Sequence, residues 1–92
     1  MSDVRHHRER GCYELQVGEA TAITAYRREG EVLSFTHTEV PEELEGQGIA
    51  TRLIAGALDQ VRADGLKIVP LCSFVRHYVE THSETQDLLA AG

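Results

Sequence analysis

Two glycines stand in a short turn just before a stretch of regularly spaced apolar residues. Gly46 and Gly48 flank Gln47, and the apolar residues begin at Ile49. Glycine can adopt a positive φ angle and lets a ligand approach the backbone closely. The N–H groups of a helix's first turn have no partner inside the helix and lie at the positive end of its dipole. The pattern therefore fits an anion site made of backbone groups, and it also fits a plain turn from strand to helix.

Two ionisable residues, His37 and Glu39, follow the apolar residues Leu33 and Phe35 at alternating positions. In a regular strand all four side chains point to one face. We therefore expect His37 and Glu39 to continue a row of core residues to the end of the sheet. There they could move a proton during catalysis. Alternatively, Glu39 caps a backbone group and His37 is an ordinary rim residue.

A cysteine, Cys72, stands next to Ser73, a residue type that favours the N-cap position of a helix. A thiol at a helix N-terminus can ionise more readily, and only the thiolate is a good nucleophile. Cys72 is therefore a candidate nucleophile, a residue that lines a site, or a small buried core residue. The second cysteine, Cys12, has no CxxC spacing to it, so the sequence predicts free thiols and no metal site.

Alternating and helical patterns predict the elements that must position these residues. Three strands over residues 12–17, 20–28 and 32–40 form an antiparallel meander. An amphipathic helix runs from Ile49 to the Asp64-Gly65 pair, where Gly65 suits the C′ position.

A short strand over residues 66–71 then lies parallel to the third strand, as the right-handed crossover rule requires. One or two short helices follow, the first with Ser73 at its N-cap and an apolar face that includes Phe74. The last is opened by a capping box at residues 83–86.

Length and composition limit the function. The chain has 92 residues, enough for one domain with one core, so a site must lie at the rim of that core. A net charge of −6 disfavours a nucleic-acid partner. No apolar run is long enough to span a membrane and no signal sequence is recognisable, so we expect a cytoplasmic protein without a membrane partner. Residues 1–11 are polar, and we expect a disordered tail there.

Three segments in this order resemble one known family. They are the residues 37–41, 45–50 and 70–75, which read HTEVP, EGQGIA and PLCSFV. The set is similar to small single-domain members of the GNAT superfamily, the acetyl-CoA-dependent N-acetyltransferases. The resemblance implies an α/β domain over residues 12–92 with the four-stranded arrangement above.

The resemblance also implies how acetyl-CoA is bound. The backbone of Gln47, Gly48, Ile49, Ala50 and Thr51 would hold the pyrophosphate of the coenzyme.

Arg52 in the first turn of the helix would offset the pyrophosphate charge. Pantetheine would run between the splayed third and fourth strands, past Val40 and Cys72. Glu45 departs from the family pattern, which has Gln or Arg at this position.

Catalysis is implied at the rim of these strands. Cys72 would accept the acetyl group or line the site, His37 or Glu39 would act as the base, and Tyr78 would protonate the leaving thiolate. The expected reaction is acetyl transfer to an amine, on a small molecule or a protein, by a monomer or weak homodimer. The alternative is a module that binds or senses acyl-CoA without turnover.

Overall fold

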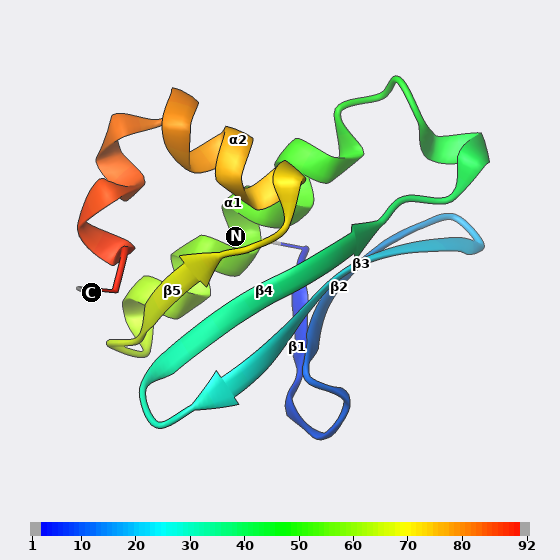
Figure 1. Cartoon of the computed structure of the whole chain (residues 1–92). Helices are drawn as coiled ribbons and strands as arrows, with labels where there is room; N and C mark the ends of the chain where they lie inside the picture. The colour runs from blue at the N-terminus through cyan, green and yellow to red at the C-terminus, as the bar shows by residue number, and fades with distance from the viewer. Residues whose placement is uncertain (1–2, 91–92) are drawn as a thin grey trace.

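One mixed sheet dominates the computed structural model, which describes residues 3–90 (Figure 1). Within that range the sheet has five strands in the order β1-β2-β3-β4-β5. Neighbouring strands are antiparallel from β1 to β4, and β5 runs parallel to β4. The strands are β1 Arg5–His7, β2 Cys12–Val17, β3 Ala20–Glu29, β4 Val32–Glu39 and β5 Lys67–Pro70. The predicted meander and its parallel neighbour are thus confirmed.

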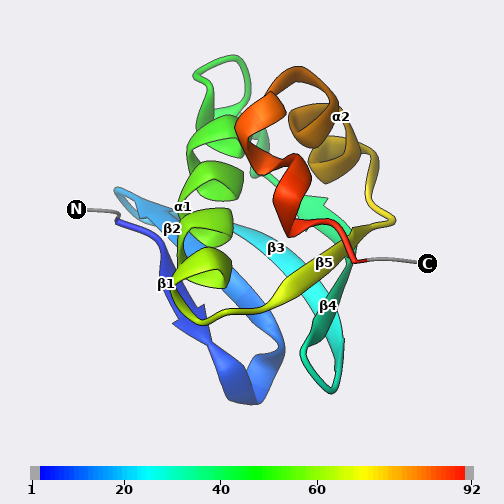
Figure 2. The ribbon, with the colours of Figure 1, turned by 90° about the vertical axis from the view of Figure 1, so that its left-hand side faces the viewer.

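Both α-helices, α1 (Ile49–Ala63) and α2 (Ser73–Thr81), cover the same face of the sheet (Figure 2). The chain also has three short 3₁₀ segments within residues 3–90: η1 Arg8–Arg10, η2 Glu42–Leu44 and η3 Ser83–Leu88. The core lies between the helices and the sheet, because α1 buries one stripe of side chains there: Ile49, Leu53, Ile54, Ala57, Leu58 and Val61. Gly65 adopts a φ of 70° just beyond the helix, as predicted.

The N-terminal segment is ordered, so the predicted tail over residues 1–11 is wrong for residues 5–10. Strand β1 pairs with β2. His6 stacks on Tyr13 with ring centroids 4.1 Å apart. Its Nε2 atom lies 2.6 Å from the Tyr26 hydroxyl. A polar three-residue strand has too few positions to show a period, and these contacts with distant residues stabilise it. Residues 1–2 of the predicted tail lie outside the described residues.

A β-bulge in β4 changes which residues share a face. Tyr26 of β3 pairs with Phe35, whereas the preceding Ala25 pairs with His37, so Thr36 is an extra residue in β4. Because the extra residue reverses the alternation, Thr38 faces the core side and His37 faces away from it. The prediction that His37 and Glu39 continue the row of Leu33 and Phe35 is therefore wrong for both residues.

The C-terminal caps also differ from the prediction. Cys72 is the N-cap residue of α2, while Ser73 is the first helical residue, and no side chain caps the helix. The predicted capping box at residues 83–86 is absent, since His82 is the N-cap of η3, no side chain caps it, and the Gln86 side chain donates to the Val79 carbonyl at 2.7 Å. In α2 only the stripe of Val75 and Val79 is buried. The neighbouring stripe begins at Phe74, which is 49% exposed.

None of the helices within residues 3–90 has the length and apolar composition needed to cross a bilayer.

Candidate active site

The turn before α1 is held by two glycines with left-handed backbone. Gly46 has a φ of 81° and Gly48, the N-cap residue of α1, has a φ of 71°. Both angles lie where residues with a Cβ atom are strained, so the local sequence itself specifies this turn. A Cβ atom built on either glycine meets no atom within 4 Å. The turn therefore faces open space.

The backbone N–H groups of this turn have no backbone acceptor in the part of the chain that the structure describes. Within residues 3–90 no well-formed hydrogen bond is donated by the N–H groups from Gly46 to Thr51, whereas the next one, on Arg52, donates to the Gly48 carbonyl at 3.1 Å. Unpaired donors at a helix N-terminus are a binding site for an anion.

A groove of about 630 Å³ runs along this turn. We call it the glycine-turn groove. The residues that line it come from β4, the loop after β4, α1 and α2: Thr38, Glu39, Val40, Leu44, Glu45, Gly46, Gly48, Ile49, Ala50, Thr51 and Phe74. Two of them are carboxylates and none is a lysine or arginine. The groove thus relies on backbone groups to attract an anion.

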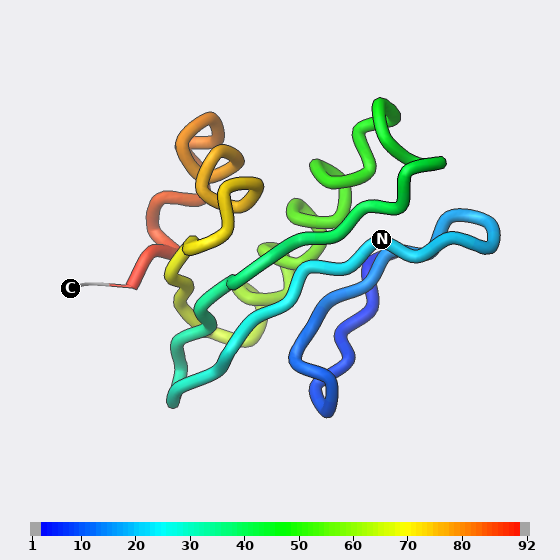
Figure 3. Tube along the Cα trace, turned by 45° about the vertical axis from the view of Figure 1, so that its right-hand side comes forward, coloured from blue at the N-terminus to red at the C-terminus, as the bar shows by residue number. Residues whose placement is uncertain are grey.

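Strands β4 and β5 separate beside the groove. They pair only from Val32 to Phe35 on β4, and the last bond across the gap runs from the Cys72 N–H to the Phe35 carbonyl at 2.8 Å. Beyond Phe35 the two traces diverge (Figure 3). No described strand therefore pairs with the β5 side of residues 36–39, and an extended ligand could add to this edge.

Cys72 lies next to the glycine-turn groove but does not line it. Its Sγ atom is 3.3 Å from the Thr38 hydroxyl oxygen, which is 2.9 Å from the Thr24 hydroxyl oxygen. Cys72 is 6% exposed and Thr24 is fully buried. Both cysteines are free, as the sequence predicted. The structure therefore brings Cys72 close to the groove, with one side chain between them.

His37 and Glu39 lie together on the sheet face away from the helices. Their Nε2 and Oε2 atoms are 4.0 Å apart, and their side chains are 57% and 69% exposed. Glu39 also lines the glycine-turn groove. The bulge therefore places this pair at the groove's edge, but on the opposite side of the sheet from Cys72.

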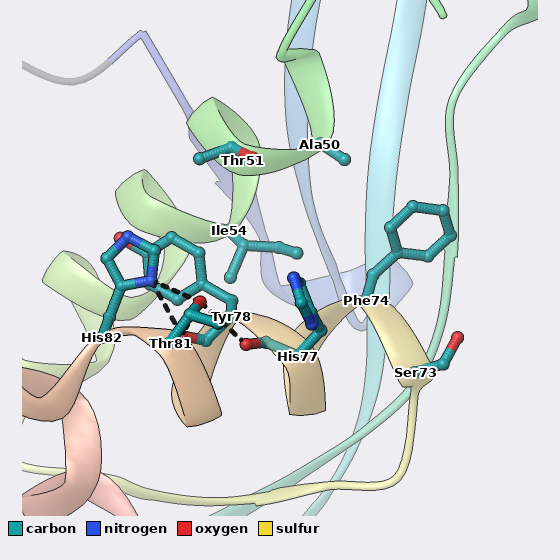
Figure 4. A pocket seen from close by; sticks show the side chains of 9 residues that line it. All are labelled: Ala50, Thr51, Ile54, Ser73, Phe74, His77, Tyr78, Thr81 and His82. Carbon is teal, nitrogen blue, oxygen red and sulfur yellow. Dashed lines mark hydrogen bonds between the residues drawn. The ribbon is translucent and has the colours of Figure 1, made fainter. Parts of the chain in front are cut away.

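A second cavity, of about 390 Å³, lies between α1 and α2 (Figure 4). It shares Ala50, Thr51 and Phe74 with the glycine-turn groove. His77 points from α2 toward Ile54 of α1 across it (Figure 4).

Tyr78 belongs to this second cavity rather than to the glycine-turn groove. Its ring stacks on His82, with centroids 3.8 Å apart. Burial raises the pKa of Tyr78, and the Glu84 and Asp59 carboxylates add to this rise. The hydroxyl therefore keeps its proton, but the structure does not bring it to the groove that Cys72 adjoins.

Two further predicted residues have side chains that point elsewhere. Arg52 reaches Asp3, with its Nη2 atom 3.5 Å from Oδ2, and lines a different groove that also includes Asp59. The Gln47 side chain donates to the Glu43 carbonyl at 3.2 Å, away from the groove lining, whereas its backbone N–H belongs to the glycine turn. Arg52 is thus not placed to offset charge at the turn.

Comparison with known proteins agrees with this geometry. Residues 12–88 match the GCN5-related N-acetyl-transferase family. The chain belongs to this family.

Several relatives of this GNAT chain have similar length. Protein NATD1 of Mus musculus is 32% identical over 88 residues, covering 92% of this chain and 80% of the relative. Protein NATD1 of Danio rerio is 28% identical over 88 residues, which again cover 92% of this chain and 80% of the relative. The NMR structure of a GCN5-like protein from Staphylococcus aureus superposes with a TM-score of 0.72 at 28% identity, over 100% of this chain and 93% of that one. The chain therefore shares the fold of this GCN5-like protein along its length.

Sequence reasoning did not single out Thr38, Thr24 or Phe74 as site residues. Thr38 could not be found by period, because the bulge at Thr36 reverses the alternation. The sequence does give a partial indication for Phe74. A nine-residue helix buries one stripe of side chains, and Val75 and Val79 form that stripe, so the apolar Phe74 beside them is left exposed. Among the described residues, no group of three His, Cys, Asp or Glu side chains is placed to hold a metal ion.

Proposed function

We propose that this GNAT chain binds acetyl-CoA and transfers the acetyl group to an amine. The observation that carries the proposal is the run of unpaired backbone N–H groups from Gly46 to Thr51, which faces an open groove beside an unpaired strand edge. Acetyl-CoA offers the matching chemistry, because its diphosphate is an anion and its pantetheine arm is an extended chain with amide groups.

Each part of the cofactor has a counterpart in the groove. The diphosphate accepts hydrogen bonds from the N–H groups of the glycine turn and of the first turn of α1. Pantetheine extends along the free edge of β4, past Val40 and Thr38. The exposed Phe74 ring, which lines both cavities, is available to stack on the nucleotide. The thioester then lies where β4 and β5 separate, near Cys72.

Direct transfer needs a neutral amine and a base. The amine approaches from the open face of the sheet, where His37 and Glu39 lie 4.0 Å apart. The nitrogen attacks the thioester carbonyl, the carbon–sulfur bond breaks, and His37 takes the proton that the nitrogen loses while Glu39 balances the charge. The coenzyme leaves as a thiolate and is protonated by solvent, because Tyr78 lines the second cavity instead of the glycine-turn groove. Transfer through Cys72 is the competing route.

The acceptor is expected to be an amine on a small molecule or a protein that is cationic in solution and loses one proton to solvent before it attacks. The net charge of −6 favours such a partner. His37 and Glu39 are more than half exposed, so a bulky acceptor can reach them. The acceptor site is shallow, and a partner or a second copy of the chain would complete it.

The shallow acceptor site favours a second candidate, an acyl-CoA-binding or sensing module, because such a module needs the coenzyme groove but no wall to hold an amine. Glu45 lines the groove, and Arg52 is paired with Asp3 instead of the turn. Both features weaken coenzyme binding in either candidate, because the carboxylate repels a diphosphate and the Arg52 charge does not offset it.

Calorimetry with acetyl-CoA, followed by an assay for released coenzyme A thiol over a panel of amines, separates the two candidates. The transferase binds and releases thiol, whereas the sensing module binds and releases none. A ligand at 100 times its Kd adds about 2.7 kcal/mol of stability, so the absence of any thermal shift at millimolar acetyl-CoA would reject both.

Intact mass after incubation with acetyl-CoA separates the two catalytic routes. Transfer through Cys72 gives one acetyl adduct of about 42 Da in the wild type and none in Cys72→Ala. Full activity of Cys72→Ala would exclude the covalent route and leave the direct route through His37.

A further inference from the structure

Three side chains from separate elements form a hydrogen-bonded chain behind the glycine-turn groove. Thr24 lies in β3, Thr38 in β4, and Cys72 at the N-cap of α2. The oxygen–oxygen distance is 2.9 Å and the oxygen–sulfur distance is 3.3 Å. Thr38 also lines the groove. The hydrogen-bonded chain therefore connects a fully buried hydroxyl to a thiol beside the glycine-turn groove.

The burial of Thr24 fixes the direction of its hydrogen bond to Thr38. Its hydroxyl has one partner within residues 3–90, the Thr38 oxygen, and its side chain has no exposure. A buried hydroxyl hydrogen without an acceptor is costly. Thr24 therefore donates to Thr38. The Thr38 hydroxyl and the Cys72 thiol can each donate to the other, but once the sulfur is a thiolate only the Thr38 hydroxyl can donate.

We propose that Thr24 and Thr38 are positioning residues that hold the Cys72 sulfur as a hydrogen-bond acceptor and so stabilise its thiolate during reaction at the groove. The inference deepens the proposed function and rests on it for its biological meaning. A hydrogen bond to a charged acceptor is stronger than one to a neutral acceptor, so the Thr38 hydroxyl stabilises the thiolate more than the thiol. The N-terminus of α2 acts in the same direction.

The hydrogen-bonded chain of Thr24, Thr38 and Cys72 supports a thioester exchange reaction. The Cys72 thiolate attacks the acetyl carbonyl of acetyl-CoA, a new carbon–sulfur bond forms, and the bond to the coenzyme sulfur breaks. The proton lost by Cys72 ends on the coenzyme thiol. No oxidant or reductant is needed.

Alkylation by iodoacetamide, without acetyl-CoA, tests the chain independently of cofactor binding. The rate at Cys72 is followed by peptide mass spectrometry in the wild type, Thr38→Val and Thr38→Ser, with Cys12 as the internal reference. At about pH 7 we expect about a threefold slower reaction in Thr38→Val, because the hydroxyl that donates to the attacking sulfur is lost. Thr38→Ser restores the rate.

The sign of the effect separates positioning from packing. A loosened structure exposes Cys72 and speeds alkylation, whereas a lost hydrogen bond slows it. A Thr38→Val protein that reacts as fast as the wild type or faster would overturn the proposal, as would a Thr38→Ser protein as slow as Thr38→Val. If Thr38→Val does not fold, Thr38→Ala is used with the same criteria. Thr24→Val is expected to react at an intermediate rate, because it acts only through Thr38.

Discussion

A single methyl group at Gly48 tests whether the glycine turn binds the coenzyme. Gly48 and Gly65 stand at opposite ends of α1 with nearly equal φ angles, 71° and 70°. A Cβ atom at either position meets nothing within 4 Å. The substitutions Gly48→Ala and Gly65→Ala therefore introduce the same strain, and only the first places a methyl group in the groove.

The stability loss is expected to be the same in both variants. A left-handed backbone costs a residue with a Cβ atom about 1–2 kcal/mol. In a domain of this size, about 1 kcal/mol corresponds to a fall in Tm of about 4–8 °C. Thermal unfolding without ligand measures this cost, and the two variants serve as controls for each other.

Coenzyme binding is expected to differ between them. At Gly48 the methyl group enters the space in front of the unpaired N–H groups, so the diphosphate cannot approach them closely. We expect at least about a tenfold weaker Kd for acetyl-CoA, or about 1.4 kcal/mol, measured by calorimetry. Gly65→Ala binds as the wild type does. Equal affinity of the two variants would refute binding at this turn.

The remaining predictions concern the groove charge and the aromatic cluster of β1 to β3. Glu45→Gln should tighten acetyl-CoA binding by up to about fivefold in calorimetry, an effect that fades with salt, while Glu43→Gln, outside the groove lining, leaves it unchanged. Tyr13→Phe should raise the free energy of unfolding by about 1 kcal/mol, because the Tyr13 hydroxyl is buried without a partner among the described residues. Tyr26→Phe should lower the free energy of unfolding by a similar amount, since this variant loses the hydrogen bond to His6. If chemical denaturation found Tyr26→Phe more stable than Tyr13→Phe, both assignments would be wrong. Burial, and then the charge of Arg8, lower the pKa of His6 below its usual 6.5. The folded protein therefore takes up this proton less readily than the unfolded chain, and stability is lost as the pH falls below 6.5. From about pH 7.5 to about pH 5, the Tm of the wild type should therefore fall more than the Tm of His6→Phe. An equal fall in both proteins would contradict this.

Local sequence signals predicted α1 and the turn before it. The apolar residues of α1 repeat with the helical period, and Gly48 and Gly65 mark its two ends by conformations that other residues avoid. The order of the strands also follows from the sequence, because short connections favour a meander and a helix between strands favours a parallel pair.

Contacts between distant residues decided what local signals could not show. Strand β1 is stabilised by the stacking of His6 on Tyr13, seven positions along the chain and on another strand. Arg52 was expected at the turn from its place in the helix. Its long side chain instead reaches Asp3, a residue 49 positions away in the sequence.

Residue types and spacing alone predict a strand end, a glycine turn and a helix start, in the order that a GNAT domain needs. Which side chains face the groove depends on how the strands pair in the folded sheet. One extra residue, Thr36, opposes no partner on β3 and reverses every side chain after it in β4. That reversal sends His37 to the open face and Thr38 to Cys72, because a pleated strand has only two faces and a bulge exchanges them.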